Sequence, residues 1–306
     1  MQVISQLFLD EFIKTSIEQD LRIRQIHLYV EGYNPIYYEF MRSHRENLFS
    51  ATKVYTSIAI GIAIDKGKFA IDDCVIDFFP EYLSLADDKV KKITIKHLLQ
   101  MNSGKEGLFF YKHPYKTYID YAKIFFQEGV QHEPGTGFYY NNLNSYMLSR
   151  IIEKVSGEKL RDYLEKRLFD RLGYFNTQWE TCPNGHTMGL DGLHLRTDEF
   201  AKVGQLLLQK GRWNGEQLVS ESYVKKMSQD LVPTIKEETE LETQQGYGYQ
   251  VWKGLYEDSF RADGLHGQFC IIYPSRNCVV TVTARQEWKP YEIIVAINEK
   301  IIQKLG

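Results

Sequence analysis

The chain has 306 residues, of which 43% are hydrophobic and 25% are charged, and its formal net charge is -3. This length is sufficient for a sizeable buried core, and the composition excludes a collagen, a coiled coil and a disordered chain. A net charge so close to zero gives no electrostatic reason to expect a nucleic-acid partner.

The cysteines and the first residues bear on the expected compartment. No two of the four cysteines form a C-x-x-C pair, so their spacing is typical of neither a zinc site nor a disulfide scaffold. Residues 1–24 carry charged side chains throughout and do not resemble a secretory signal. The longest strongly apolar stretch, residues 58–64, is far shorter than the ~20 residues of a membrane span. We therefore expect a cytoplasmic protein with reduced thiols and no membrane span.

Hydrophobic periodicity predicts helices at both ends and in the middle of the chain, with strands between them. The expected elements are, in chain order, a helix over 3–20, a hairpin of strands over 23–30 and 36–41, helices over 51–66, 95–101, 144–155, 160–172 and 198–210, strands over 247–252, 259–262, 268–273 and 278–284, and a helix over 291–305.

Capping residues and glycines support several of these bounds. Thr94 and Thr197 are expected to be helix N-caps, while Gly67 and Gly211 are expected to end the helices before them. The segment 233–245 is polar and rich in Glu, Thr and Gln, which predicts a mobile surface loop.

The order of the elements predicts the architecture. The first and last strands are expected to pair in one sheet, with the helix-rich middle as an insertion. We therefore predict an α/β (α+β) fold that forms one unit over residues 1–306. It would contain a sheet subdomain, residues 1–90 and 245–306, and a helical subdomain, residues 91–244.

The tetrapeptide S-x-x-K occurs three times, and one copy is placed for nucleophilic chemistry. On a helix, residues i and i+3 share a face, so a neutral lysine amine there accepts the serine proton. Ser50 and Lys53 open the most apolar helix, whose N-terminus offers a positive dipole end to an oxyanion. The alternative is that Ser50 only caps the helix while Lys53 reaches water. The two other copies, expected to be solvated caps, are Ser156/Lys159 and Ser222/Lys225.

A family resemblance rests on several runs of sequence. These runs are residues 48–53, 60–68, 77–81, 93–104, 133–142, 195–198 and 211–215. In this order they resemble the β-lactamase-related serine hydrolases, which include class C β-lactamases, D-Ala-D-Ala peptidases, family VIII esterases and 6-aminohexanoate-oligomer hydrolases. The resemblance covers about residues 25–300. It implies a β-lactamase/transpeptidase-like fold, an antiparallel sheet flanked by helices plus a helical subdomain, with Ser50 as the nucleophile.

The resemblance also implies a second motif, Y-x-N. In the family its tyrosine shuttles a proton to the leaving group, and its asparagine binds the substrate or the lysine. The family pattern has an aromatic residue two positions before the tyrosine and a polar residue two positions after the asparagine. Only Tyr140 and Asn142, flanked by Phe138 and Asn144, meet this pattern. The other pairs with the right spacing are Tyr139/Asn141, the second choice, and Tyr174/Asn176.

A third family motif, Lys-Thr-Gly or His-Thr-Gly, is replaced here by Ala-Asp-Gly at residues 262–264. The lysine and threonine that receive a substrate carboxylate are missing, and Asp263 would repel one if it faces the site. The resemblance implies that the backbone N–H groups of Ser50 and Leu265 form the oxyanion hole. The candidate substrate and oxyanion contacts are Asn142, Gly264, Leu265 and His266.

Together these residues predict a serine hydrolase. Ser50 attacks a small ester, amide or peptide substrate to form an acyl-enzyme, and Lys53 and Tyr140 handle the protons. His266 has an alternative interpretation as a surface histidine at a strand-edge turn. The absence of G-x-S-x-G argues against a Ser-His-Asp hydrolase of the α/β type. No metal or cofactor is expected, since H-E-x-x-H, P-loop and G-x-G-x-x-G patterns are absent from the sequence. We expect weak or no β-lactamase activity. The alternatives are a true β-lactamase or D-Ala-D-Ala carboxypeptidase, and a penicillin-binding-like receptor that is acylated without turnover.

Overall fold

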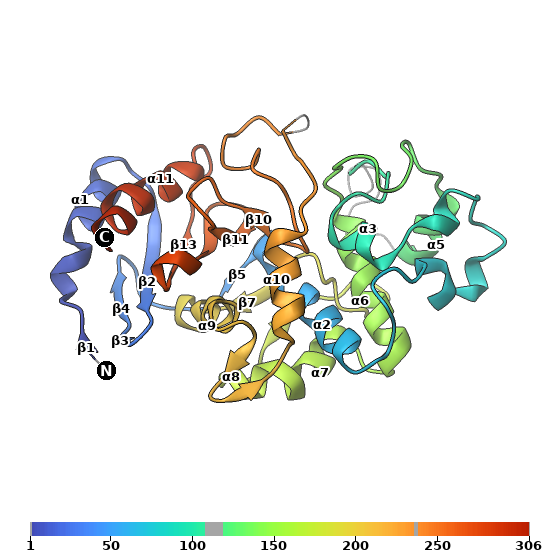
Figure 1. Cartoon of the computed structure of the whole chain (residues 1–306), viewed down its shortest axis with the longest axis horizontal. Coiled ribbons are helices and arrows are strands. Elements are labelled where there is room, and N and C mark those ends of the chain that lie inside the picture. Colours follow the sequence, from blue (N-terminus) through green and yellow to red (C-terminus); the bar gives the residue numbers. More distant parts are fainter. Residues whose placement is uncertain (1, 108–118, 236–237, 306) are drawn as a thin grey trace.

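A computed structural model describes residues 2–107, 119–235 and 238–305 of the chain (Figure 1). Its main sheet is antiparallel, and the strand order is β10-β11-β12-β13-β2-β4. The expected pairing of the first strands with the last ones is therefore confirmed. The strands of this sheet are β2 (Ile23–Val30), β4 (Ile36–Glu39), β10 (Trp252–Lys253), β11 (Phe260–Gly264), β12 (Gln268–Tyr273) and β13 (Cys278–Ala284).

Shorter strands form small sheets around the main one. A parallel pair consists of β1 (Gln2–Val3) and β3 (Tyr33–Asn34). A second small sheet has the order β5-β7-β6, made by β5 (Glu46–Asn47), β6 (Gln178–Trp179) and β7 (Leu193–Leu195). A third is the hairpin of β8 (Arg212–Trp213) and β9 (Glu216–Gln217).

Helices cover the sheet and build the rest of the molecule. In the described ranges they are α1 (Asp10–Glu18), α2 (Lys53–Asp65), α3 (Ile95–Leu99), α5 (Tyr121–Gln127), α6 (Asn142–Ser156), α7 (Leu160–Leu164), α8 (Asp170–Leu172), α9 (Thr197–Leu208), α10 (Glu221–Gln229) and α11 (Tyr291–Lys300). Figure 1 shows α1 and α11 at the end of the molecule that holds the chain termini, and α3, α5 and α6 at the opposite end.

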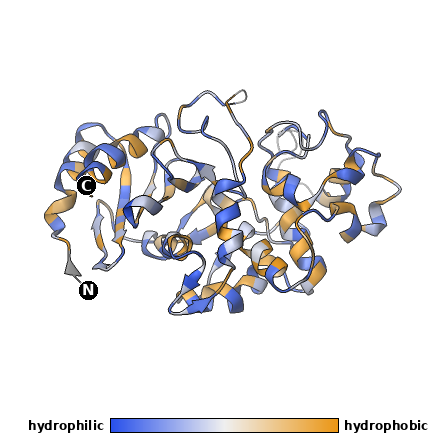
Figure 2. Ribbon diagram, viewed as in Figure 1, coloured by the Kyte–Doolittle hydropathy of each residue, from blue (hydrophilic) through white to orange (hydrophobic). Residues whose placement is uncertain are grey.

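The main sheet separates two hydrophobic cores, because successive residues of a strand point to opposite faces. Val279 of β13 belongs to the core that also contains α2, α6 and α9. Its neighbour Val280 belongs to the second core, together with residues of α1 and α11. Hydrophobic and hydrophilic residues alternate along the helices that cover the sheet, as expected for helices with one buried face (Figure 2). No helix in the described ranges is long and apolar enough to cross a membrane.

Some predicted element bounds were wrong. The first helix was expected over 3–20, but Ser5 caps a separate 3₁₀ turn and α1 begins only at Asp10. Thr197 was expected to be the N-cap of α9, but it is the first residue of that helix and Arg196 is the N-cap. The Arg196 N–H donates to Glu199 Oε2 at 2.9 Å. The strand expected over 247–252 is reduced to β10, because Gln250 has a left-handed backbone with φ of +63°.

The polar segment 233–245 is irregular, as expected for a loop, but part of it is buried. Its described residues form no helix or strand, but Thr234, Glu242 and Thr243 are buried. Thr234 Oγ1 donates to the Thr243 carbonyl at 2.6 Å, and Glu242 forms an ion pair with Arg261. Ile235 and Leu241 are 65% and 66% exposed, so the segment is a surface loop held by these buried contacts, and its mobility stays a prediction. Residues 236–237 lie outside the described residues, and the subdomain boundaries at 90 and 245 stay a prediction.

Candidate active site

The predicted nucleophile Ser50 lies at the junction of β5 and α2. It belongs to a 3₁₀ turn, Phe49–Thr52, and Lys53 is the first residue of α2. Lys53 Nζ donates a hydrogen bond to Ser50 Oγ at 2.9 Å and another to the Leu190 carbonyl at 2.9 Å. The structure therefore brings together the serine and lysine of the S-x-x-K motif, at a distance that allows direct proton transfer.

Lys53 is buried, with only 1% of its surface exposed. Burial disfavours the charged ammonium and lowers the Lys53 pKa from 10.5 to about 7, although Asp191 and Asp263 oppose this change. A substantial fraction of this lysine is therefore neutral near pH 7, whereas a surface lysine is almost fully charged. The alternative that Lys53 reaches water is wrong.

Tyr140 and Tyr139 occupy different surroundings. The Tyr140 hydroxyl is within hydrogen-bonding reach of Ser50, and Lys53 Nζ lies 5.1 Å from the centre of the Tyr140 ring. Burial raises the pKa of the Tyr140 phenol, so it stays protonated at neutral pH. The Tyr139 ring instead stacks on His132, with ring centres 4.0 Å apart. Only Tyr140 of this adjacent pair is therefore placed beside Ser50 and Lys53.

The two other S-x-x-K serines make local hydrogen bonds. Ser156, at the end of α6, donates to the Ile152 carbonyl at 2.6 Å. Ser222, in the first turn of α10, is 3.2 Å from the hydroxyl of Ser220, the N-cap of that helix. Both serines therefore lie at helix ends.

Two neighbouring asparagines at the start of α6 differ in their hydrogen bonds. Asn141 is the N-cap, and its side chain accepts from the Leu143 N–H at 2.8 Å and donates to the Lys105 and Glu106 carbonyls. Asn142 is the first residue of α6, and its buried Oδ1 accepts no hydrogen bond from any residue that the structure describes. The role of Asn142 in substrate binding stays a prediction.

The end of β11 packs directly against the turn that carries Ser50. A Cβ atom on Gly264 would lie 2.2 Å from the Leu48 carbonyl oxygen and 3.1 Å from the Ala51 nitrogen, so only glycine fits there. This contact brings Leu265, the next residue, to the region of Ser50. The Leu265 side chain is exposed, so its contribution to the site would come from its backbone.

His266 has a left-handed backbone, with φ of +67°, in the turn between β11 and β12. Its ring meets the Phe49 ring edge-on, with ring centres 5.2 Å apart. His266 and Phe49 both line a pocket of about 460 Å³ beside the Ser50 turn. The other residues that line this pocket are His44, Arg45, Glu46, Asn47, His194, Gln268, Ala284, Arg285 and Glu287.

Asp263 is held by an arginine on its own strand. Arg261 Nε donates to Asp263 Oδ2 at 2.9 Å, and Arg261 also pairs with Glu242 at 3.3 Å. The Arg261 side chain is only 1% exposed. Burial raises the pKa of the Asp263 carboxyl, while Arg261 opposes that rise. The positive charge of Arg261 is therefore neutralised by two carboxylates of the protein itself.

Sequence reasoning missed two parts of this site. Tyr140 packs against Trp252 and Tyr247, whose ring centres are 5.9 and 6.0 Å from its own. The loop at 189–192 supplies the carbonyl that accepts from Lys53, and its sequence, Gly-Leu-Asp-Gly, carries two glycines with positive φ. Those closely spaced glycines were the available signal for a tight loop.

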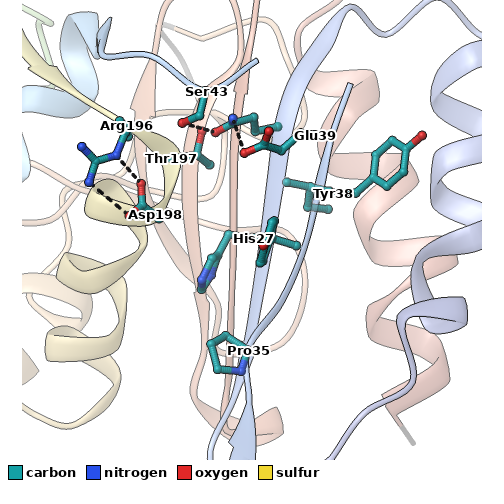
Figure 3. A pocket seen from close by; sticks show the side chains of 11 residues that line it. His27, Pro35, Tyr38, Glu39, Ser43, Arg196, Thr197 and Asp198 are labelled. Atoms are coloured by element: carbon teal, nitrogen blue, oxygen red, sulfur yellow. Dashed lines mark hydrogen bonds and ion pairs between the residues drawn. The ribbon is translucent and has the colours of Figure 1, made fainter. Parts of the chain in front are cut away.

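A second pocket, of about 430 Å³, lies between β2, β4 and the start of α9 (Figure 3). His27, Glu39 and Arg196 are among the residues that line it, and no predicted site residue is. The described residues also contain no group of three or more His, Cys, Asp or Glu side chains arranged to hold a metal ion. Among the described residues, the predicted site residues therefore gather around Ser50 and Lys53 and not at this second pocket.

Comparison with known proteins identifies the family of the chain. The family model described as Beta-lactamase matches residues 42–298, which include the Ser50 turn, the Tyr140 loop and the end of β11. The chain belongs to the beta-lactamase family. The predicted β-lactamase/transpeptidase-like fold and the predicted relationship to serine hydrolases are thereby confirmed.

Curated relatives of this beta-lactamase family chain differ in their named activities. A lovastatin esterase of Penicillium rubens is 27% identical over 155 residues, which are 43% of this chain and 39% of the relative. Penicillin-binding protein 4* of Bacillus subtilis is 29% identical over 139 residues, 43% of this chain and 30% of the relative. The chain thus spans less than half the length of these relatives.

Among solved structures, EstCE1, described as a hydrolase with promiscuous acyltransferase activity, superposes with a TM-score of 0.77. The match covers 97% of this chain and 98% of EstCE1 at 16% identity. An identity this low shows that the two proteins share a fold. The substrate has to be inferred from the chemistry of the site.

Proposed function

We propose that this protein is a serine hydrolase that works through an acyl-enzyme on Ser50. The observation that carries the proposal is the 2.9 Å contact between Ser50 Oγ and the amine of the buried Lys53. A serine hydroxyl is a weak nucleophile until a neighbouring base accepts its proton. Lys53 has the distance and, with a pKa of about 7, the basicity to do so near neutral pH.

Tyr140 completes the proposed proton path. Its phenol stays protonated because burial raises its pKa, so it is suited to pass a proton on and not to remove one as a phenolate. In the proposed first step, Ser50 Oγ bonds to the substrate carbonyl carbon and its proton goes to Lys53. The proton then moves through Tyr140 to the leaving group as the bond from carbonyl carbon to that group breaks. Water hydrolyses the resulting ester by the same path.

The negative charge on the carbonyl oxygen needs hydrogen-bond donors. We assign this role to the backbone N–H groups of Ser50 and Leu265, because Gly264 lets the end of β11 approach the Ser50 turn without a side chain between them. Asn142 is proposed to hydrogen-bond the substrate or Lys53, the role that the Y-x-N motif gives its asparagine in the family. His266, which lines the pocket beside the turn, is proposed as a further substrate contact.

The proposed substrate is a small ester or a neutral or cationic amide. A β-lactam or a peptide ending in D-alanine carries a carboxylate near the reacting carbonyl, which needs a cation to bind it. Arg261 is already paired with Asp263 and Glu242, so it is not available for that role. Loss of one charge-assisted hydrogen bond costs about 1.5–3 kcal/mol, roughly 10- to 150-fold in binding.

Steady-state kinetics on p-nitrophenyl butyrate and on nitrocefin test this proposal. We expect saturable ester turnover, lost in Ser50→Ala and kept in Ser222→Ala, which removes the serine of another S-x-x-K copy. Nitrocefin turnover should be weak. Efficient nitrocefin turnover with poor ester turnover would favour a true β-lactamase, with the exposed Arg285 as the cation to test next. Acylation without recovery of free enzyme would favour a penicillin-binding-like receptor.

A further inference from the structure

The residue before Ser50 has an unfavourable backbone conformation. Phe49 has a φ of +47°, in the left-handed region that glycine adopts easily and other residues rarely adopt. For an ordinary L-residue this conformation is disfavoured by roughly 5- to 30-fold. Because Phe49 immediately precedes Ser50, the direction of the serine side chain depends on this conformation being held.

The side chain of Asn47 holds the Phe49 backbone. Asn47 Oδ1 accepts a hydrogen bond from the Phe49 N–H at 2.8 Å. A short polar side chain that binds the backbone two residues later is a recognised way of fixing a turn. The bond is made in the described conformation, so it offsets part of the cost of the positive φ at Phe49.

The same oxygen reaches the loop that positions Lys53. Asn47 Oδ1 also accepts from the Gly192 N–H at 3.2 Å. Gly192 is two residues after Leu190, whose carbonyl accepts from Lys53 Nζ at 2.9 Å. One side-chain oxygen therefore links the backbone before Ser50 to the loop that fixes the amine of Lys53.

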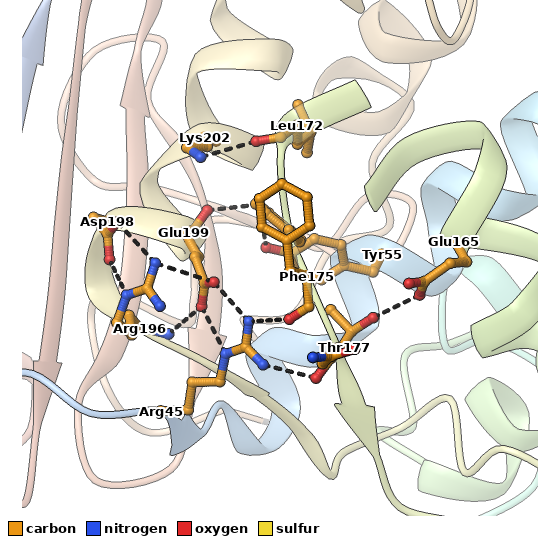
Figure 4. Close-up of polar contacts among 12 residues, drawn as sticks. Arg45, Tyr55, Glu165, Leu172, Phe175, Thr177, Arg196, Asp198, Glu199 and Lys202 are labelled. Carbon is orange, nitrogen blue, oxygen red and sulfur yellow. Dashed lines mark hydrogen bonds and ion pairs between the residues drawn. The ribbon is translucent and has the colours of Figure 1, made fainter. Parts of the chain in front are cut away.

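Asn47 itself is fixed by its strand. It pairs with His194 in the β5–β7 ladder, and two residues earlier Arg45 anchors β5 to the rest of the molecule. Arg45 forms two hydrogen bonds with Glu199, at 3.0 and 2.8 Å, and donates to the Phe175 carbonyl at 2.6 Å (Figure 4). Glu199 is only 1% exposed, so this anchor is built into the protein interior.

We propose that Asn47 is a positioning residue, whose side-chain oxygen keeps Ser50 Oγ and Lys53 Nζ in reach of each other by joining the Phe49 turn to the Leu190–Gly192 loop. This inference rests on the proposed function of Ser50. Asn47 acts on the geometry of the two groups and takes no part in the proton path. Its loss should therefore lower kcat and leave KM nearly unchanged.

The test compares p-nitrophenyl butyrate hydrolysis by Asn47→Ala and Asn47→Asp in the full-length protein. We expect Asn47→Ala to lower kcat about 10- to 100-fold, as small displacements of reacting groups do. Asn47→Asp keeps an acceptor oxygen and should stay within about threefold of the wild type. If the alanine variant does not fold, Asn47→Gln, which moves the oxygen by one methylene, should show the same loss of kcat.

A double-mutant cycle with Phe49→Gly separates positioning from general stabilisation. Glycine adopts positive φ freely, so in the Phe49→Gly background the loss caused by Asn47→Ala should shrink by at least about threefold. Equal losses in both backgrounds, or full activity of Asn47→Ala, would overturn the inference while the Ser50 mechanism stood. A wild-type protein without esterase activity or labelling at Ser50 would instead overturn the proposed function.

Discussion

Lys53 lies in an environment very different from that of a surface lysine. Its amine is buried, bound to Ser50 and to the Leu190 carbonyl, and its pKa is lowered from 10.5 to about 7. The sequence predicted the S-x-x-K pair and a buried helix, and its closely spaced glycines signal a tight loop at 189–192, but nothing in it places the Leu190 carbonyl beside the Lys53 amine. That carbonyl lies 137 residues further along the chain, so only the tertiary fold brings it there.

The lowered Lys53 pKa predicts how activity depends on pH. The proposed base must be neutral to accept the serine proton, so kcat/KM for p-nitrophenyl acetate should fall about tenfold per pH unit below 7 and level off above it. Rates over pH 5.5 to 9, corrected for spontaneous hydrolysis, give this profile. A midpoint near 10, or a flat profile, would show that a lysine with this environment is not the base.

The two adjacent tyrosines give a second prediction at the residue scale. Tyr140→Phe removes only the hydroxyl near Ser50 and should lower kcat about 100-fold or more, as loss of general acid–base catalysis does. Tyr139→Phe is the matched control, since the Tyr139 ring stacks on His132 and its hydroxyl has no proposed role. Ester kinetics on both variants decide between them, and the reverse ranking would move the Y-x-N motif to Tyr139 and Asn141.

At the scale of elements, strong periodicity predicted long segments well and irregular ones poorly. Strands β2, β12 and β13 have the predicted bounds, because their apolar residues fit a buried strand. The helix expected over 160–172 is interrupted by a π turn at Glu165–Phe169, which periodicity does not reveal. The strand expected over 247–252 failed because the left-handed Gln250 interrupts an otherwise strand-like run.

The contact between β11 and the Ser50 turn yields a prediction about an element. In Gly264→Ala the new methyl would lie 2.2 Å from the Leu48 carbonyl oxygen, so the strand must move away from the turn. We expect the free energy of unfolding to fall by about 1–3 kcal/mol. Esterase kcat should fall roughly tenfold or more, because the Leu265 N–H moves with the strand.

Gly129→Ala is the control for this substitution. Its methyl would lie 3.1 Å from Asp87 Oδ2, a much milder contact than the 2.2 Å at Gly264, so we expect a change in stability within about 0.5 kcal/mol. Urea denaturation and ester kinetics on both variants make the comparison. A Gly264→Ala protein with wild-type stability and activity would show that the close approach of β11 to the turn is not required.

At the scale of the whole molecule, the candidate site is assembled from distant parts of the chain. The Ser50 turn, the loop before α6 and the end of β11 meet although the sequence separates them widely. Motif spacing predicted Ser50, Lys53 and Tyr140, because family patterns are local in sequence. The pairing of Arg261 with Glu242 and the link from Asn47 to Gly192, 145 residues apart, are tertiary contacts that no local pattern encodes.

The most direct test of the account is to find where a serine-directed fluorophosphonate reacts. Intact-mass spectrometry followed by peptide mapping should give one adduct on the wild-type protein, on the peptide that contains Ser50. Ser50→Ala should keep its fold, as judged by circular dichroism and thermal unfolding, and should acquire no adduct. An adduct of the same mass on folded Ser50→Ala protein, or its location on Ser156 or Ser222 in the wild type, would contradict the assignment of Ser50 as the nucleophile.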